Sequence, residues 1–375
     1  MENLTSNGSE IYKLPFVEIP FLSIVIVIGV VGNLFVIGAV RCERRLKNCG
    51  VGFVINLAIA DLAITAWYLP IVLANVASDY RNILADSKLC HFTALLSNVC
   101  CETSMFTLMF ISMNRYWKIT KPNSYYRWFG GRKTLGWIAF IWLLSFLLAL
   151  PLLVGWAGSS PLVTFDVKMM SCMWNDHSEY GYNIFLVSTA IFVPICTTAF
   201  FYIKIFAHVR KSRKRAAARE IASPNGSSSR VTQHSSVSDD PPSSAMQNVR
   251  SHHSRHSSIN AHKMSRSKRI GERDRALMMT LFIVIIFFLL FWLPYGVMTL
   301  IWRHNVTALA KRACGWLALS NSAINSIIYG ATNRHFRRGY VKLLKRINDV
   351  LCCGRKLTTP RGMTSEIKQP SVKFG

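Results

Sequence analysis

The sequence predicts an all-α membrane protein, a seven-transmembrane helix bundle with a short amphipathic eighth helix. Three observations lead to this prediction. The 375 residues are 51% hydrophobic and yet carry a formal net charge of +26, a combination that soluble globular domains rarely show. Seven apolar stretches are long enough to cross a hydrocarbon core about 30 Å thick. After the seventh, a basic stretch that also contains aromatic and aliphatic residues favours a helix on the membrane surface.

The connections between the apolar stretches differ strongly in charge. Lysine and arginine crowd residues 41–47, 118–133 and 204–275 and the chain after Asn333, whereas the other connections carry few charges. By the positive-inside rule, the basic connections are cytoplasmic and the N-terminus is extracellular. We therefore expect a multi-pass plasma-membrane protein with a cytoplasmic C-terminus. The expected spans are 19–40, 52–77, 90–114, 134–155, 182–207, 276–302 and 313–331.

The spans and their flanks divide the chain into four expected parts. These are an extracellular N-terminus at 1–18, a transmembrane domain at 19–332, a membrane-surface helix at 333–347 and a cytoplasmic tail at 348–375. Within the transmembrane domain, the third cytoplasmic loop at about 212–270 is rich in Ser, His, Arg and Pro, so we expect it to be disordered. The N-terminus lacks the basic start of a cleavable signal, and the first span is expected to act as its own uncleaved signal.

Composition and motifs exclude several functions. A basic chain can bind nucleic acid, but a basic cytoplasmic face beside anionic lipid is the ordinary state of a membrane protein, so we expect no nucleic-acid partner. The spans show no metal-binding histidine spacing, Gly-rich phosphate loop or nucleophile motif, and we do not expect an enzyme. The sequence also lacks the internal repeats and interrupted helices that are typical of many transporters.

Two acidic residues fall inside predicted spans, where a charge is costly and usually faces the bundle interior or water. Asp61 in the second span is a functional candidate on this ground, and the alternative is a protonated acid that hydrogen bonds to a neighbouring helix. Glu102 in the third span is either a ligand anchor or a neutral, hydrogen-bonded structural acid. It lies next to a face with small and polar residues at helical spacing, Ser97, Cys101 and Ser104, which we expect to look into the bundle.

Cysteines and sequons predict three covalent modifications. Cys90 and Cys172 are the two cysteines best placed in outer connections, so a disulfide between them is the natural pairing. It would hold the long outer loop over the mouth of the bundle. Sequons near the N-terminus predict glycosylation, and a cysteine pair after the basic stretch suits palmitoylation; these residues are Asn3, Asn7, Cys352 and Cys353.

Short motifs recur through all seven spans in an order that resembles the rhodopsin class, or class A, of G-protein-coupled receptors. The resemblance runs from about Val31 to Tyr340. Each motif alone is weak, but together their spacings are compatible. They are Gly32-Asn33, the Leu-Ala-x-x-Asp that ends at Asp61, Cys90, Arg115-Tyr116, Trp142, Pro194 with Tyr202, Phe288 with Trp292 and Pro294, and Asn325 with Tyr329.

Within this class the chain resembles melatonin receptors and related orphan receptors. Asn114-Arg115-Tyr116 stands where most members begin with an acid, and Asn325-Ser326-Ile327-Ile328-Tyr329-Gly330 where most have proline second. Two departures argue against melatonin itself as the ligand. Leu152 replaces an asparagine that contacts ligand, and Asp176 stands where those receptors have a glutamine. Ser97 occupies the position of the aspartate of amine receptors, so an aminergic interpretation loses its main counter-ion.

The resemblance implies a ligand pocket, an activation switch and a site for an allosteric sodium ion. Oxygen ligands around a carboxylate are suitable for such an ion. No cofactor is implied. The ligand pocket opens outward, and its implied residues are Ser97, Asn98, Cys101, Glu102, Trp174, Trp292, Tyr295 and Met298. The implied residues of the activation switch and G-protein contact are Asn114, Arg115, Tyr116, Tyr202, Asp274, Phe288, Trp292, Asn325 and Tyr329. The implied sodium ligands are Asp61, Ser104, Asn321, Ser322 and Asn325.

The resemblance also suggests how the inner end works. Arg115 can reach Asp274 at the base of the sixth helix, a pairing that resembles the class's inactive-state latch. Asn114 is neutral where an acid would restrain Arg115, so either the restraint is weaker and a protonation switch is lost, or Asn114 is simply a hydrogen-bonding replacement. Our hypothesis is that Asn114→Asp lowers basal signalling and makes it more sensitive to pH.

The implied function is that of a receptor that binds an extracellular ligand and activates a heterotrimeric G protein, of the inhibitory class by the melatonin-like resemblance. Further implied partners are the lipid bilayer, arrestin and receptor kinases. The alternative is a non-signalling ligand-binding or scavenger protein with the same seven helices. A light receptor is excluded, because the last span from Cys314 to Gly330 contains no lysine for a Schiff base.

Overall fold

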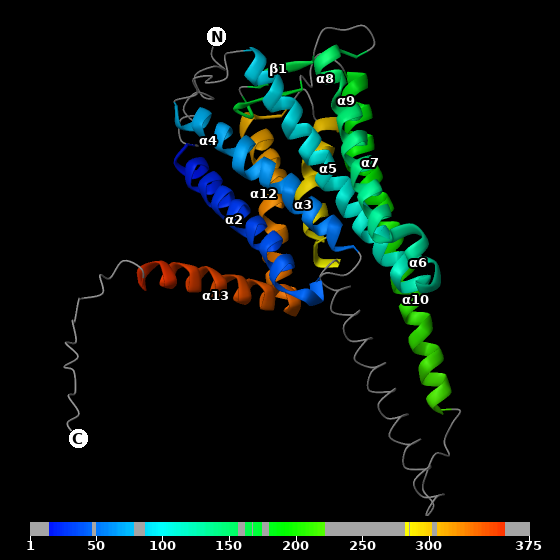
Figure 1. The fold of residues 1–375 in the computed structure, drawn as a ribbon. Helices are drawn as coiled ribbons and strands as arrows, with labels where there is room; N and C mark the ends of the chain where they lie inside the picture. The colour runs from blue at the N-terminus through cyan, green and yellow to red at the C-terminus, as the bar shows by residue number, and fades with distance from the viewer. Residues whose placement is uncertain are drawn as a thin grey trace, which may run out of the picture.

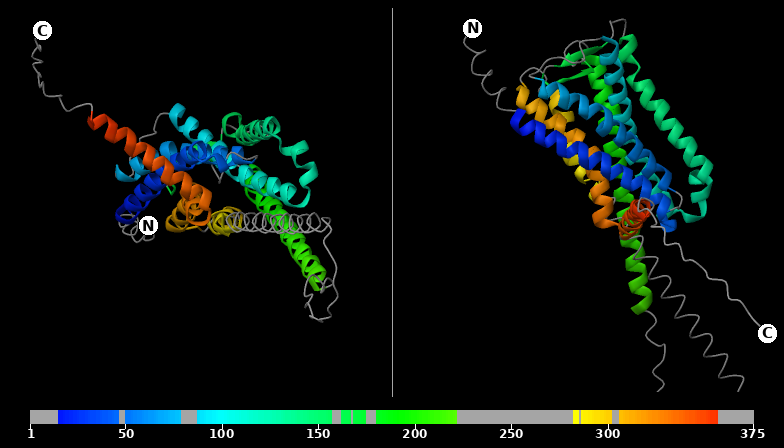
Figure 2. Two further views of the ribbon diagram at one scale, coloured as in Figure 1. Left: turned by 60° about the horizontal axis from the view of Figure 1, so that its bottom comes forward. Right: turned by 60° about the vertical axis from the view of Figure 1, so that its left-hand side comes forward.

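The structure is a computed structural model. It describes residues 15–46, 50–78, 87–156, 162–166, 168–174, 180–221, 282–284, 286–301 and 306–356. Helices run side by side in an elongated bundle, and one further helix lies across its end (Figures 1 and 2). Six of the described helices are long and apolar enough to cross a membrane. With the less apolar α12 they form the seven-helix membrane bundle that the sequence predicts.

The spans follow the predicted order, and two of them are interrupted by a π-helical turn. In chain order the spans are α2 (Pro15–Cys42); α3 (Val51–Ala63) with η2 (Ile64–Tyr68) and α4 (Leu69–Ala77); α5 (Ser87–Thr120); α7 (Gly131–Ala149) with α8 (Pro151–Val154); α9 (Tyr180–Val187) with η3 (Ser188–Phe192) and α10 (Val193–Ile221); the helix Phe282–Ile301; and α12 (Ala308–Thr332). The shorter elements are η1 (Arg44–Leu46), α6 (Pro122–Phe129), β1 (Val163–Asp166) and β2 (Ser171–Trp174), and α13 (Arg334–Lys356) is the eighth long helix.

The third span, α5, is the central helix. In its most apolar stretch 78% of the residues are buried, against 28% in α2 and in the fourth span. It packs against α3, α7 and α10 along its length and against both strands at one end. Such burial explains why its sequence carries polar residues all round, since neighbouring protein rather than lipid surrounds it.

Prolines account for the two π-helical turns. Pro70 lies two residues after η2, and Pro194 two residues after η3. A proline cannot donate the backbone hydrogen bond to the preceding turn, and its ring crowds the carbonyl there, so a local widening relieves the clash. The turns place Tyr68 on one side of the bundle interior, and Ala190 and Ile191 on the other.

Small residues let α2 and α12 approach closely. A Cβ added to Gly32 would lie 2.1 Å from Ser326 Oγ and 2.7 Å from Ser326 Cβ. One residue later, Asn33 Nδ2 donates to the carbonyl oxygen of Ser322 at 2.9 Å. The lone amide of the first span is therefore a buried link between two helices, as small and polar residues often are in membrane bundles.

The amphipathic α13 lies across the end of the bundle opposite the two strands (Figures 1 and 2). Tyr340 anchors it, because its phenol donates to the carbonyl oxygen of Ser326 at 3.1 Å and its ring packs on Phe35 and Phe336. Burial raises the pKa of Tyr340, so the phenol remains a donor at neutral pH. Leu344, Ile347 and Val350 stay exposed, a pattern that suits contact with lipid; Lys342 pairs with Glu43 at 2.7 Å.

The long outer loop forms a feature that the sequence analysis did not predict, an antiparallel hairpin of β1 and β2. Phe165 pairs with Cys172, and the predicted disulfide between Cys90 and Cys172 is present with Cα atoms 5.3 Å apart. The tight turn is closed by Asp166, whose Oδ1 accepts from the backbone amides of Lys168 and Met169 at 2.7 and 3.2 Å. The disulfide pins β2 to the first turns of α5.

Three helices extend well beyond their expected C-terminal ends. The third continues to Thr120 rather than ending at 114. The fifth continues to Ile221, into the expected loop at 212–270, because residues 216–221 are mostly good helix formers. The membrane-surface helix continues past 347 to Lys356, since no proline or glycine occurs between Gly339 and Gly354. Of the expected end segments 1–18 and 348–375, only 15–18 and 348–356 are among the described residues.

Candidate functional site

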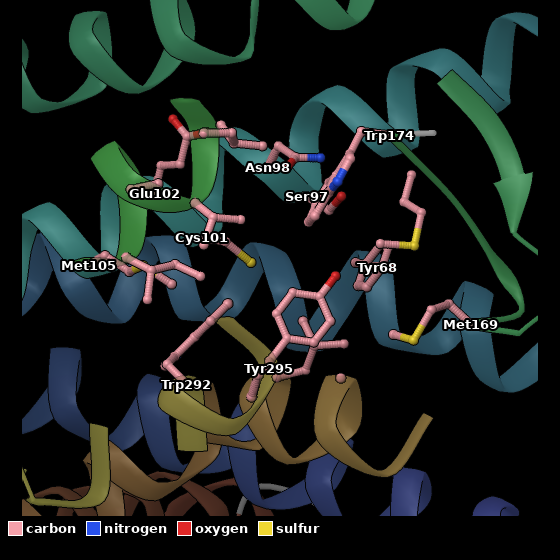
Figure 3. A pocket seen from close by; sticks show the side chains of 18 residues that line it. Tyr68, Ser97, Asn98, Cys101, Glu102, Met105, Met169, Trp174, Trp292 and Tyr295 are labelled. Carbon is pink, nitrogen blue, oxygen red and sulfur yellow. The ribbon is translucent and has the colours of Figure 1, made fainter. Parts of the chain in front are cut away.

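A cavity lies beneath β2, enclosed by α5, the fifth and sixth spans, α12 and the π-helical turn η2 (Figure 3). Figure 3 shows Glu102 and Met105 at one end of it, and Tyr68 and Met169 at the end nearer the hairpin. Most of its wall is apolar or aromatic, with a few polar groups, as is typical of small-molecule sites. The lining residues are Tyr68, Ser97, Asn98, Cys101, Glu102, Met105, Met169, Met173, Trp174, Leu186, Val187, Ala190, Ile191, Trp292, Tyr295, Gly315, Ala318 and Leu319.

Seven of the eight implied pocket residues line this cavity: Ser97, Asn98, Cys101, Glu102, Trp174, Trp292 and Tyr295. Met298 does not; it is buried in the apolar core, a little less than one helical turn beyond Tyr295. The fifth span was expected to line the pocket, but none of its residues was named in advance; those that do so are Leu186, Val187, Ala190 and Ile191, at the spacing of one helical face. Met169 and Met173 were missed because their approach depends on the hairpin.

Glu102 is the lining side chain with two buried oxygen atoms that lack hydrogen bonds among the described residues. It is 3% exposed, and neither carboxyl oxygen has a hydrogen-bond partner among the described residues. The indole N–H groups of Trp174 and Trp292 also lack partners in the described part of the chain. Buried polar groups are nearly always hydrogen bonded, so these three groups mark places where a further molecule fits.

Ion pairs fasten the hairpin end of the cavity. Lys311 Nζ lies 2.6 Å from Asp166 Oδ2, and Arg312 donates from Nε to the carbonyl oxygen of Lys168 at 2.6 Å. The Arg312 guanidinium, 2% exposed, also pairs with Glu18 at 3.4 Å. These contacts join α2, the hairpin turn and α12, and they pair both Lys311 and Arg312 with an acid.

Polar groups also gather at the middle of the bundle around Asp61, which is fully buried. Its Oδ1 accepts from Ser104 Oγ and its Oδ2 from Asn325 Nδ2, both at 3.0 Å, and Ser322 lies beside the same carboxylate. Among the described residues, the side-chain oxygens of Asn321 and Asn325 accept no hydrogen bond. Of the other four implied sodium ligands, Ser104, Ser322 and Asn325 contact Asp61, and Asn321 precedes Ser322 in α12.

At the opposite end of α5 from the cavity lies the implied switch. Asn114 Nδ2 donates to the phenol oxygen of Tyr125 on α6 at 3.1 Å. Arg115 lies near enough to Tyr202 and Tyr329 to interact electrostatically with both. The remaining implied switch residues lie as follows: Tyr116 packs on Phe201, Tyr329 stacks on Phe336, and Phe288 and Trp292 occupy successive turns of the helix Phe282–Ile301.

Several predicted residues lie outside the described residues and are not placed here. These are the latch partner Asp274, the glycosylation candidates Asn3 and Asn7, and the outer-loop residue Asp176. Cys352 and Cys353 lie in the last turns of α13.

Two comparisons with known proteins bear on this arrangement. Residues 32–329 match the model of the 7 transmembrane receptor (rhodopsin family). The chain is 27% identical to melatonin receptor type 1B-B of Danio rerio over 328 residues, 86% of this chain and 79% of that protein, and 25% identical to melatonin receptor type 1A of Mus musculus, covering 85% and 77%. It is also 28% identical to the alpha-1A adrenergic receptor of Oryzias latipes, covering 86% and 65%.

The match to the family model covers most of the chain and includes at least part of each of the seven spans. The disulfide between Cys90 and Cys172, the buried acid of the second span and the cavity beneath the hairpin all fall within the matched region. The chain belongs to the rhodopsin family of seven-transmembrane receptors.

Proposed function

We propose that the chain is a plasma-membrane receptor that binds an extracellular ligand in the cavity beneath β2 and activates a heterotrimeric G protein. The main support for this proposal is that the single helix α5 reaches from the cavity to the opposite end of the bundle. It lines the cavity at Ser97 and carries Arg115 at its other end, about 27 Å away at 1.5 Å per residue. One buried helix thus links a ligand site with a cationic side chain at the far membrane face.

The proposed orientation places the hairpin and disulfide outside the cell. Disulfides persist in oxidising surroundings, and the other end of the bundle carries the basic last turns of α10 and the basic helix α13. By membership of the family, G protein, arrestin and receptor kinases would meet this basic end. Palmitoylation of Cys352 and Cys353 would add anchors to a helix that already presents apolar residues toward lipid.

The proposed mechanism moves the inner end of the helix Phe282–Ile301 outward when ligand binds. Trp292 and Tyr295 line the cavity on this helix, so a ligand contacts it directly. Pro294 lies between them and removes one backbone hydrogen bond, which makes a hinge there. Outward movement frees Arg115 for the tail of the G protein, while Tyr202 and Tyr329 rearrange beside it.

Similarity alone does not assign the ligand. Identities to melatonin and adrenergic receptors differ by only a few per cent, and those receptors are named for chemically different ligands. Coupling to an inhibitory G protein rests on the melatonin receptors being among the most similar proteins. A non-signalling ligand-binding protein with the same seven helices is the alternative, and the intact Arg115-Tyr116, Tyr202 and Tyr329 argue against it.

The buried oxygens around Asp61 fit an allosteric sodium ion. Asp61, Ser104, Asn321, Ser322 and Asn325 would hold it, and their carboxylate, hydroxyl and amide oxygens are the ligands that hard cations prefer. When bound, the ion neutralises a carboxylate that is costly in the membrane interior. Since these groups come from α3, α5 and α12, holding them together favours one arrangement of the three helices.

G-protein activation measured with a panel of G-protein sensors in cells tests the proposal. The wild type is expected to activate at least the inhibitory class above a mock-transfected control, spontaneously or in a ligand screen. Arg115→Ala is expected to lower the signal at least tenfold at equal surface expression, and Arg132→Ala, an exposed arginine at the same end, is expected to leave it unchanged. A surface-expressed wild type that binds ligand and activates none of the sensors would establish the non-signalling alternative.

A further inference from the structure

The geometry points to a specific ligand class: Glu102 is the counter-ion of a positively charged amino group, so the ligand is a small organic cation with an aromatic ring. This inference rests on the proposed ligand cavity. It does not rest on G-protein coupling.

The first support is the state of Glu102 itself. A structural acid inside a membrane bundle is expected to hydrogen bond to a neighbouring helix, as Asp61 does through Ser104 and Asn325. Glu102 has no such partner for either oxygen among the described residues, although it is 3% exposed and lines the cavity. Burying a carboxylate without a partner is costly, and a cationic ligand would offset part of that cost.

The second support is the charge of the cavity. Glu102 is the one carboxylic acid among the lining residues, and the described lining contains no lysine, arginine or histidine. Of the cations at the hairpin end that the structure describes, Lys311 and Arg312 bind Asp166 and Glu18, and Lys168 donates from Nζ to the carbonyl oxygen of Val306 at 3.2 Å. In this low-dielectric site a ligand carboxylate or phosphate would face an acid with no compensating cation among the described lining residues, whereas an ammonium group would be attracted.

Aromatic side chains supply the third support. Tyr68, Trp174, Trp292 and Tyr295 border the cavity, and Tyr295 makes edge-to-face contacts with both tryptophans at 6.3 Å between ring centroids. Their faces attract cations as well as aromatic rings. The unpartnered indole N–H groups of Trp174 and Trp292 favour a ligand that also carries an oxygen acceptor.

Glu102 further sets the depth at which the amine lies. It follows Ser97 by five residues, or about 7.5 Å along α5, away from the hairpin. Figure 3 shows Glu102 at the end of the cavity far from Met169, with Trp292 and Met105 on the same side. Ser97 occupies the position at which amine receptors have their aspartate counter-ion. Here Glu102 would take that role about one and a half turns deeper in the cavity, so the ligand would enter with its amine first.

Two matched sets of probes test the charge preference. Each set keeps one ring and varies the charge: tryptamine, N-acetyltryptamine and indole-3-acetate, and phenethylamine, N-acetylphenethylamine and phenylacetate. Dissociation constants are measured on the full chain in lipid nanodiscs without G protein. The wild type is expected to bind at least one of the amines ten times or more tightly than its neutral and anionic analogues.

Variants of Glu102 then assign the preference to this side chain. Glu102→Gln is expected to weaken amine binding at least tenfold while changing binding of the neutral analogue less than threefold, and Glu102→Asp is expected to restore part of the difference. Glu43→Gln, which changes a buried acid at the other end of the bundle, is the control and is expected to keep the preference. Equal binding of amine and neutral analogue, a preference that survives Glu102→Gln, or no amine binding to wild type would each overturn the inference.

Failure here is separable from failure of the proposed signalling. Amine binding that depends on Glu102, without activation of any G-protein sensor, would keep the ligand class and overturn the coupling. Activation by neutral compounds that is unaffected by Glu102→Gln would keep the coupling and overturn the ligand class.

Discussion

Asn114 shows how one neutral residue changes the inner end of the bundle. Its amide nitrogen donates to Tyr125 of α6, and its carbonyl oxygen lies 3.5 Å from the same phenol. The added Cβ of any residue at Gly50 would also lie 2.6 Å from that oxygen, so Asn114 is enclosed by protein. The side chain therefore tethers α5 to α6 and is not directed at Arg115 alone. Of the two roles that the sequence allows for Asn114, this contact favours hydrogen bonding.

Asn114→Asp tests whether the tether restrains signalling. An ionised carboxylate would accept a charge-assisted hydrogen bond from Tyr125 and attract the adjacent Arg115, which stabilises the observed arrangement by about 1 kcal/mol more than the amide does. Basal G-protein activation is then expected to fall about fivefold, and to recover as the pH falls and the carboxylate is protonated. The measurement is basal cAMP signalling at several pH values.

As a control, the same substitution is made in a receptor that also carries Tyr125→Phe, which keeps the ring and removes the hydroxyl. Asn114→Asp is expected to lower basal activity less in that background than in the wild type, because the shared hydrogen bond is gone. Basal signalling that is the same for the wild type and for Asn114→Asp at every pH would show that the tether does not restrain the switch.

At the scale of elements, two glycines of α2, which have no side chain, allow close contacts with η2 and with α12. Gly29 and Gly32 lie one turn apart on α2, and an added Cβ at either would lie within 2.3 Å of a side-chain atom of Thr65 or Ser326. Close approach of this kind gives membrane helices the dispersion contacts that the hydrophobic effect does not supply between them. The same region brings Asn33 to the carbonyl oxygen of Ser322, beside the Asp61 cluster.

Gly32→Ala is therefore expected to destabilise the receptor. The new methyl group overlaps Ser326 Cβ as well as its hydroxyl. Rotating the Ser326 side chain therefore does not relieve the clash, and the two helices must separate. Overpacking of this kind lowers the free energy of unfolding by about 1–3 kcal/mol. Gly136→Ala in α7 is the control, because its added Cβ meets no atom within 4 Å. Thermal denaturation in detergent should show a lower midpoint for Gly32→Ala alone, and equal midpoints for both variants would refute the close contact.

Elements differ in how far the sequence predicts them. Long apolar runs predicted the order of the spans and most of their described ends to within several residues, because lipid requires an apolar helix of sufficient length; the basic end of α10 beyond residue 207 was not predicted. The hairpin of β1 and β2 was not predicted, since its four-residue strands depend on the Cys90–Cys172 disulfide and on the turn at Asp166. The π-helical turns before Pro70 and Pro194 were missed for a similar reason, because a proline alone does not specify how the freed backbone relaxes.

Across the whole molecule, α5 connects three groups of residues: the cavity at Glu102, the Asp61 cluster through Ser104, and the inner end at Arg115. Family motifs indicated which residues take part, so most of the site was predictable from sequence. They did not indicate which polar groups lack partners. Whether Glu102 is a structural acid or a ligand anchor depends on neighbours far away in the chain, and only the packed bundle distinguishes the two.

The Asp61 cluster gives a prediction at this scale, because its five side chains come from three helices. A cation that binds the assembled cluster and not the separated helices stabilises the receptor by RT ln(1 + [Na⁺]/Kd), about 1.4 kcal/mol at ten times Kd. Replacing choline chloride by sodium chloride at constant ionic strength should therefore raise the denaturation midpoint of the purified receptor. Asp61→Asn is expected to abolish this rise, since the amide offers no charge to the ion.

The same variant separates the ion from the fold. The amide that Asp61→Asn introduces would still accept from Ser104 and lie beside Asn325, so this receptor should fold and differ mainly in its response to sodium. Ser104→Ala removes one oxygen and is expected to weaken the sodium effect in part. Because the ion would favour one arrangement of α3, α5 and α12, sodium should also weaken binding of an activating ligand in the wild type. A denaturation midpoint that rises equally in wild type and Asp61→Asn would show that sodium acts elsewhere on the protein.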